Sequence, residues 1–421
     1  MQALLMPMGS QGDVQPYIGM GLQLQRRGHA VLIAANVYFE SLVRTHGLDF
    51  VGLKSSPDLE AFFKQPDLCN PKRAWQAAGR WGTLAPMREI YQIIADRYVP
   101  GETVVAAPYG AFGARLAQER LGVPLATVLL LPNELRSLYR TPVLPKPLVL
   151  HDWVPRFLKR LQFWIMDRFF VDPLVGPETN AFRAELGLPP VRGFLAHWCF
   201  SPDRVIGCFP EWYAPYQPDW PCQTRLTGFP RWDPPISRAE HREAMEFLEA
   251  GEPVIAFTAG SYNRHGQAFF QAAVESCAAL GRRGVLLTKY RDQLPERLPA
   301  EVRHFDFVPL AAVLPHAAAL VSHGGIGTVA QALVAGVPQV LMPIAFNQPD
   351  EAVRLKRLGV ANFIPPEHFR GRRLTRVLKQ LLASSQVRQR CRELAEWFHA
   401  VDSVQETCDL VQELQGLDLR R

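Results

Sequence analysis

A glycine-rich turn at residues 321–328 carries the strongest chemical signal in this sequence. It reads Val-Ser-His-Gly-Gly-Ile-Gly-Thr and joins an apolar run to a helical pattern. Glycines let the backbone approach a ligand closely, a helix N-terminus presents free N–H groups, and Thr328 adds a hydroxyl. The turn therefore suits a diphosphate held without a metal ion. The alternative is a turn needed only for tight packing of the strand against the helix.

A second turn, Gly-Ser-Gln-Gly-Asp at residues 9–13, follows the first apolar run. Asp13 lies one residue past Gly12, at the carboxyl end of the first expected strand, where open α/β sheets bind ligands. A carboxylate there can act as a general base toward a hydroxyl. The helix N-terminus should favour the ionised form and make Asp13 a weak base. The alternative is a helix cap just before a helix that starts near Pro16, and the two roles can coexist.

Alternating apolar runs and helical patterns must position these turns. In the first 130 residues we expect strands at 3–8, 30–35, 50–53, 103–107 and 124–131. We expect helices at 16–27 and 109–121, and another helix that follows the second strand and ends at 46. In the second half we expect strands at 254–258, 284–288, 302–307, 319–321 and 339–342. We expect one helix at 267–280, a second that begins at 327, and a helical pattern from 374 onward. This rhythm predicts two α/β domains, each with a mostly parallel sheet.

A segment rich in proline and tryptophan, residues 209–235, separates the halves. We expect an N-terminal domain over 1–228, a linker over 229–252 and a C-terminal domain over 253–421. The last helices are expected to cross back onto the N-terminal domain.

Composition narrows the classes of protein. The chain has 421 residues and a net charge of +6, with Lys and Arg spread along its length, so it does not resemble a dedicated nucleic-acid binder. Its seven cysteines have no ligand spacing and are expected to be free thiols in a reducing cytoplasm. We found neither a signal peptide nor a spanning apolar stretch. We therefore expect a cytoplasmic protein, for which peripheral contact with the inner face of the cell membrane stays open.

Large aromatic residues interrupt the alternation between residues 132 and 200. Trp153, Phe157 and Trp164 belong to this segment. One interpretation is an amphipathic helix over 157–170 whose apolar face packs on the sheet. The other is an apolar acceptor site or a surface that faces a membrane, and it makes these three residues, together with Gly12, the candidate acceptor contacts.

The turn at 321–328 does not stand alone, because Gly336-Val337-Pro338 and then Asn347-Gln348 follow it. This run resembles the donor-site signature of the family 1 glycosyltransferases. In that family the His-Gly-Gly turn holds the diphosphate, a polar residue eight positions later meets the ribose, and an acidic residue followed by Gln meets the sugar. The resemblance implies a donor site made of Gly260, Ser261, Phe307, Val308, His323, Gly325, Ile326, Gly327, Thr328, Gln331, Asn347 and Gln348.

Two positions depart from the family pattern. Gln331 stands where Glu is common at the ribose, and Asn347 stands where Asp or Glu is common at the sugar. Both keep hydrogen-bonding capacity and lose charge, which puts UDP-glucose in doubt as the default donor. Phe307 resembles the plate on which such enzymes stack the base; the alternative is a core phenylalanine that ends a strand.

The resemblance covers nearly the whole chain and extends to bacterial macrolide, glycopeptide and sterol glycosyltransferases; it is strongest to the bacterial rhamnosyltransferases of rhamnolipid synthesis. It implies the two-domain glycosyltransferase-B fold, in which the N-terminal domain binds the acceptor, the C-terminal domain binds the nucleotide sugar, and the active site lies in the interdomain cleft. It also implies inverting transfer with no metal and no cofactor, from a dTDP-rhamnose or UDP-glucose type of donor to a hydrophobic hydroxyl such as that of a hydroxy-fatty acid. From its position at the strand end, we expect Asp13 to be the base in this reaction. A non-catalytic nucleotide-sugar-binding protein and a sugar-nucleotide epimerase of the same fold stay as alternatives.

Overall fold

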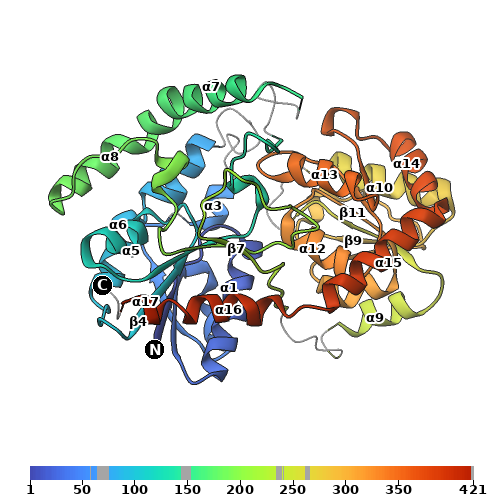
Figure 1. Cartoon of the computed structure of the whole chain (residues 1–421). Helices are drawn as coiled ribbons and strands as arrows, with labels where there is room; N and C mark the ends of the chain where they lie inside the picture. Colours follow the sequence, from blue (N-terminus) through green and yellow to red (C-terminus); the bar gives the residue numbers. More distant parts are fainter. Residues whose placement is uncertain are drawn as a thin grey trace. The chain divides into compact units, whose positions relative to one another are not determined.

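The computed structural model describes residues 1–56, 58–63, 75–143, 153–233, 239, 241–260 and 266–418. The chain divides into two compact units. The first is made of Met1–Trp232 together with Asp402–Arg421, and the second of Asp233–Val401. Each unit is built on a parallel sheet that helices cover (Figure 1). The prediction of two parallel-sheet α/β domains is confirmed.

The sheet of the first unit has the order β3-β2-β1-β4-β5-β6-β7, and its neighbouring strands pair in parallel. The central strands β4 and β5 are buried along their whole length, which explains why the sequence shows them as continuous apolar runs rather than as alternating ones. The strands are β1 (Gln2–Leu5), β2 (Ala30–Asn36), β3 (Asp49–Leu53), β4 (Thr103–Ala107), β5 (Leu125–Leu129), β6 (Arg204–Gly207) and β7 (Thr224–Leu226).

Helices that connect these strands cover the first sheet. They are α1 (Gln11–Arg26), α2 (Glu40–Thr45), α3 (Leu59–Phe63), α5 (Met87–Ala95), α6 (Phe112–Leu121), α7 (Arg156–Met166) and α8 (Asp172–Glu185), with π-helical turns η3 (Ala78–Leu84), η5 (Asp167–Val171) and η6 (Phe194–Trp198). Short 3₁₀ turns η1 (Val37–Phe39) and η4 (Pro132–Glu134) follow β2 and β5.

The C-terminal helices α16 (Ser403–Gln412) and α17 (Gln415–Asp418) belong to the first unit. α16 lies beside α1 (Figure 1). The Arg27 guanidinium pairs with the Asp409 carboxylate at 2.7 Å, and the Thr227 and Thr407 hydroxyls are 2.9 Å apart. Residues far apart in the sequence thus complete one core.

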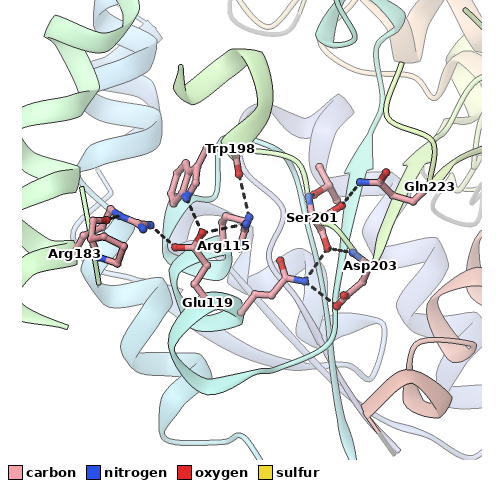
Figure 2. A network of polar contacts seen from close by, with 10 residues as sticks. Arg115, Glu119, Arg183, Trp198, Ser201, Asp203 and Gln223 are labelled. Carbon is pink, nitrogen blue, oxygen red and sulfur yellow. Dashed lines mark hydrogen bonds and ion pairs between the residues drawn. The ribbon is translucent and has the colours of Figure 1, made fainter. Parts of the chain in front are cut away.

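A buried polar network ties α6 to the irregular segment that precedes β6 (Figure 2). The Glu119 carboxylate accepts from the indole N–H of Trp198 at 3.0 Å and pairs with the guanidinium groups of Arg115 and Arg183. The neighbouring residue of α6, Gln118, donates from its side-chain amide to the Ser201 hydroxyl at 2.9 Å and to Asp203 at 2.7 Å. These contacts fix η6 and the segment between η6 and β6 to α6.

The sheet of the second unit has the order β10-β9-β8-β11-β12-β13 and is also parallel. Its strands are β8 (Val254–Thr258), β9 (Gly284–Leu287), β10 (Val302–Phe305), β11 (Ala317–Ser322), β12 (Gln339–Leu341) and β13 (Ala361–Phe363). Its helices are α9 (Arg242–Glu249), α10 (Gln267–Leu280), α11 (Leu310–Val313), α12 (Ile326–Val334), α13 (Gln348–Arg357), α14 (Gly371–Ala383) and α15 (Ser385–His399). Short 3₁₀ turns η7 (Arg291–Gln293), η8 (Leu314–His316) and η9 (Pro366–His368) complete it.

Several local features differ from the expectations drawn from the sequence. α1 begins at Gln11 rather than near Pro16, and β6, β7 and β13 were not anticipated. The segment expected to be a linker contains α9, whose Ala244 and Leu248 are buried in the core of the second unit.

Two expectations from composition can be compared with the described part of the chain. Six cysteines there are free, whereas Cys69 lies outside it. None of the helices in this part is both long and apolar enough to cross a membrane.

Candidate functional site

Both sheets reverse their strand order beside the first strand. β1 lies between β2 and β4, and β8 lies between β9 and β11. Ligands of open α/β sheets bind outside the carboxyl ends of the strands at such a point. The Asp13 turn follows β1, and the His323 turn follows β11. Each unit therefore carries its chemical residues at the position that the topology favours.

Asp13 occupies the third position of α1, where it closes a capping box with Ser10. The Ser10 backbone N–H and the Ser10 hydroxyl both donate to Asp13 Oδ2, at 2.7 and 2.9 Å. Oδ1 accepts no hydrogen bond from the residues that the structure describes. A Cβ atom on Gly9, which has φ +118°, would lie 2.4 Å from Oδ2, so this approach requires glycine. Asp13 therefore caps the helix and still has one oxygen available.

The pKa of Asp13 shifts in the direction opposite to the expectation from the sequence. Burial raises the pKa of the Asp13 carboxyl above its ordinary value, and this effect exceeds the opposing effect of the two hydrogen bonds from Ser10. A helix N-terminus had been expected to keep the carboxylate a weak base. The net shift is upward, because a half-buried carboxylate loses hydration that the two Ser10 donors do not replace. Asp13 is a stronger base than the sequence suggested.

Three residues near Asp13 were missed by sequence reasoning. Tyr109 follows β4 and Glu134 ends the turn after β5, so both lie at the same sheet edge as Asp13. Tyr17, one helical turn after Asp13, is 1% exposed, and no described residue hydrogen-bonds its hydroxyl. Burial, reinforced by the charges of Glu134 and Asp13, raises the pKa of both tyrosines. For Tyr109 and Glu134, the position shortly after a strand end was the signal that could have identified them, whereas Tyr17 lies within α1 and had no such signal.

In the second unit, the His323 ring lies between two glycines. A Cβ atom on Gly260 would lie 2.9 Å from His323 Cε1, and one on Gly325 would lie 2.6 Å from Nε2. Gly260 follows β8 and His323 follows β11, so the two neighbouring strands bring together residues 63 positions apart. The predicted donor residues Gly260, His323 and Gly325 are therefore in contact, whereas Ser261 lies outside the described residues.

The His323 imidazole is neutral at physiological pH. Burial lowers the pKa of His323 to about 4, and its Nδ1 is buried without a partner among the described residues. A neutral imidazole can donate one N–H and accept at the other nitrogen. His323 can therefore contribute a hydrogen bond to an anion but not a full positive charge.

The start of α12 supplies further donors. Gly325 is its N-cap residue, and Ile326, Gly327 and Thr328 form its first turn. The first N–H groups of a helix have no partner inside the helix, so these backbone groups and the half-buried Thr328 hydroxyl can bind an anion.

The predicted ribose and sugar residues have defined partners. The Gln331 amide donates to Asp233 Oδ1 at 2.9 Å, while Gln331 Oε1 is buried without a partner among the described residues. Gln348 Oε1 accepts from the backbone N–H groups of Ile344 at 2.7 Å and Ala345 at 3.1 Å. Its oxygen thus fixes the loop before α13, and its NH₂ group makes no hydrogen bond to the described residues. Asn347 Nδ2 is buried without such a partner among the described residues.

Phe307 lies two residues beyond the end of β10 and is 57% exposed. This exposure excludes the alternative of a core phenylalanine at a strand end and leaves a ring face open for stacking. Its neighbour Val308 is 4% exposed and packs in the core of the second unit.

The candidate acceptor residues lie on two parts of the first unit. Gly12 is half-buried in the first turn of α1, next to Asp13. Trp153, Phe157 and Trp164 are 80%, 69% and 55% exposed. The interpretation in which the apolar side of this helix packs on the sheet is wrong, because that side faces solvent.

Both halves of the chain match known protein families. Residues 3–139 match the model of the glycosyltransferase family 28 N-terminal domain, and residues 283–414 match the C-terminal domain of erythromycin biosynthesis protein CIII-like proteins. The chain is 30% identical over 426 residues to O-mycaminosyltylonolide 6-deoxyallosyltransferase of Streptomyces fradiae, and the match covers 98% of this chain and 97% of that enzyme.

Solved structures show the same fold. The glycosyltransferase of kitacinnamycin aligns with a TM-score of 0.75 at 20% identity, over 98% of this chain and 99% of that one. The glycosyltransferase VinC in complex with dTDP aligns with a TM-score of 0.66 at 18% identity, over 99% and 100%. The fold is thus that of the glycosyltransferase-B enzymes. With a relative of 30% identity along nearly its whole length and both domain models matched, this chain belongs to the family 1 glycosyltransferases.

Proposed function

We propose that this glycosyltransferase moves a sugar from a dTDP-rhamnose or UDP-glucose type of donor to the hydroxyl of a hydrophobic acceptor, with inversion at the anomeric carbon. One observation carries the donor part of the proposal. The His323 ring, two close glycines and the start of α12 converge at the strand-order reversal of the second unit. This arrangement concentrates hydrogen-bond donors without a fixed positive side chain, which suits a diphosphate.

The sugar and the nucleotide would bind on either side of the diphosphate. Asn347 and the NH₂ group of Gln348 are proposed to meet the sugar hydroxyls, Gln331 the pentose, and Phe307 the base. Phe346, exposed to 43% and held at φ 55°, adds an apolar surface next to Asn347. An apolar contact there favours a deoxyhexose, which carries a methyl group at C6. The VinC complex with dTDP supports a thymidine nucleotide.

Asp13 is the proposed base. Its free Oδ1 would take the proton from the acceptor hydroxyl as that oxygen attacks the anomeric carbon. The bond from this carbon to the diphosphate oxygen breaks as the new glycosidic bond forms, and the nucleoside diphosphate leaves with the bonding electrons. Because attack comes from the side opposite the leaving group, the anomeric configuration inverts.

The proposal requires neither a metal ion nor a cofactor. The charge that develops on the departing diphosphate would be met by the N–H groups at the start of α12, the Thr328 hydroxyl and the neutral His323. Preorganised donors of this kind stabilise a developing anion without reorganising during the reaction.

The acceptor is proposed to be a hydroxy-fatty-acid lipid, as in rhamnolipid synthesis, and contact with a membrane surface is part of this proposal. Gly12 would lie near the reacting hydroxyl, and Trp153, Phe157 and Trp164 would contact the apolar part. Burial of apolar surface is worth about 25 cal/mol per Å², so an aromatic surface favours a lipid over a small sugar. A planar polyketide, a phenol and a sterol are the competing acceptors.

Product analysis by mass spectrometry tests the proposal. The enzyme is incubated with dTDP-rhamnose or UDP-glucose and, separately, with a hydroxyalkanoyl lipid, a sterol or a flavonoid. A glycosylated lipid is expected, and its anomeric configuration is read by NMR. Exclusive use of a hydrophilic sugar acceptor would contradict the acceptor assignment. A thermal-shift comparison of UDP, dTDP and GDP identifies the nucleotide independently, because a ligand that binds only the folded protein raises the unfolding temperature.

A further inference from the structure

The helix α7 exposes its apolar side. Phe157, Leu161 and Trp164 repeat at helical spacing, and the row continues into η5. α7 runs along the margin of the first unit, away from the sheet (Figure 1). We define the α7 stripe as the exposed apolar residues of this segment: Trp153, Phe157, Leu158, Leu161, Trp164, Ile165, Phe169 and Phe170, which are between 39% and 80% exposed.

The opposite side of the same segment carries two buried charged residues, beside the half-buried Phe163. Lys159 is 1% exposed, and its ammonium group donates to the Leu138 carbonyl oxygen at 3.2 Å. Asp167 is 9% exposed and pairs with the Arg136 guanidinium at 2.7 Å. A surface helix of a globular protein normally buries its apolar side. Here two charged anchors hold the helix in the reverse orientation, so the exposure of the stripe is built into the packing.

Three exposed arginine residues lie in the same segment as the α7 stripe. Arg156, Arg160 and Arg168 are exposed, whereas Asp167, the one acidic residue between positions 153 and 171, is buried and paired. Arg160 lies between Phe157 and Trp164 in the same helical row. The exposed surface of this segment therefore combines aromatic side chains with net positive charge.

We propose that the α7 stripe docks this enzyme on an anionic lipid bilayer, with the aromatic side chains in the interface and the arginines on lipid phosphates. Tryptophan and phenylalanine on one side with arginine beside them are the composition of helices that lie in a membrane interface. A second copy of the chain is a poor occupant, because it would bring two cationic stripes together. The inference deepens the proposed function, since a lipid acceptor would reach the enzyme from that surface.

Sedimentation with sucrose-loaded vesicles tests the proposal. The full chain is mixed with vesicles of pure phosphatidylcholine or of phosphatidylcholine with about 30% phosphatidylglycerol, as a chosen composition, at low and high salt. We expect binding to the anionic vesicles that weakens as salt rises, because an arginine near such a surface contributes about fivefold in affinity when it is not screened. Binding to neutral vesicles should be at least about tenfold weaker, since three arginines lose that contribution.

The double variant Leu161→Ser/Phe169→Ser removes two members of the stripe that are outside the proposed acceptor contacts. We expect it to bind anionic vesicles at least about tenfold more weakly than the wild type. Trp397→Ser is the matched control, because Trp397 is 44% exposed but belongs to α15. It should bind like the wild type. Arg160→Gln should weaken binding at low salt, whereas Arg160→Lys should not. Circular dichroism and thermal unfolding establish that each variant is folded.

Equal vesicle binding by the wild type and a folded Leu161→Ser/Phe169→Ser variant would overturn the proposal, as would no binding by the wild type. A wild-type dimer in light scattering that this variant abolishes, without vesicle binding, would overturn it in favour of self-association. Vesicle binding is measured without substrate. If the enzyme binds vesicles but glycosylates no lipid, the docking proposal stands and the proposed acceptor is refuted. If it glycosylates a lipid but does not bind vesicles, the proposed acceptor stands and the docking proposal is refuted.

Discussion

The substitution Asp13→Asn removes the proposed catalytic base and keeps the side-chain oxygen that caps the helix. The asparagine side-chain oxygen can still accept the Ser10 N–H that lies 2.7 Å from Oδ2, but the amide cannot take a proton. Loss of a general base lowers the rate by roughly 10² to 10⁴, which corresponds to about 3 to 5 kcal/mol of activation free energy. The transfer rate should therefore fall by that factor, whereas nucleotide affinity should be unchanged.

Two opposing effects bound the change in stability of this variant. The neutral amide accepts more weakly at the cap, which costs up to about 1 kcal/mol. Because burial raises the folded-state pKa of Asp13 above its unfolded value, the wild type loses stability as pH rises from the unfolded to the folded pKa. The variant avoids that loss. The free energy of unfolding at pH 7 should thus differ from the wild type by no more than about 1 kcal/mol.

The assay is the initial rate of glycoside formation at several pH values. In the wild type, kcat/KM should fall on the acid side as Asp13 takes a proton, at a pH above the ordinary aspartate value of 3.8. Ser10→Ala removes the hydroxyl donor at 2.9 Å, so it should raise the pKa of Asp13 and move that limb to higher pH. The residual rate of Asp13→Asn should lack the limb. Near-normal turnover by a folded Asp13→Asn enzyme would refute the base assignment and leave Asp13 a cap.

Three further predictions concern the second unit. Replacing His323 or Thr328 by Ala should weaken nucleotide-sugar binding by about 1.5 to 3 kcal/mol in calorimetry, and unchanged affinity in both variants would refute the donor site. The His323 Cε1 proton should not shift between about pH 5.5 and 8 in NMR spectra of the free enzyme, because its pKa is about 4; a midpoint near the ordinary value of 6.5 would contradict the buried ring. Asn347→Asp should change which nucleotide sugar is used while bare dTDP binds as before, and a collapse of dTDP binding would show that Asn347 acts on the nucleotide.

The sequence predicted the strands that form continuous apolar runs, such as β4 and β5, and it predicted both ends of α10. It placed the start of α1 wrongly because Pro16 was taken as a first-turn residue, whereas the local signal was the capping box formed by Ser10 and Asp13. β7 and β13 have three residues each and no apolar run, so only their pairing with neighbouring strands defines them.

At the candidate sites too, the sequence did not predict the properties that depend on packing between distant residues. Motif spacing led to Asp13 and His323, but the pKa of Asp13 depends on hydration lost through packing, which no spacing encodes. The periodicity of α7 was visible in the sequence, whereas the choice of which side faces the unit depends on the partners of Lys159 and Asp167. The pairing of Gln331 with Asp233 joins residues 98 positions apart and could not be read locally.

The return of α16 to the first unit bears on how the protein is synthesised. Thr407, Cys408 and Val411 are fully buried, and the Cys408 thiol contacts the Met20 carbonyl oxygen at 3.5 Å. A ribosome must therefore translate the whole second unit before the first can finish its core. During that interval, the surface of α1 that α16 covers is exposed to solvent and available to chaperones. Loss of residues 402–421 would leave the second unit its own core and make the first the aggregation-prone part of the nascent polypeptide.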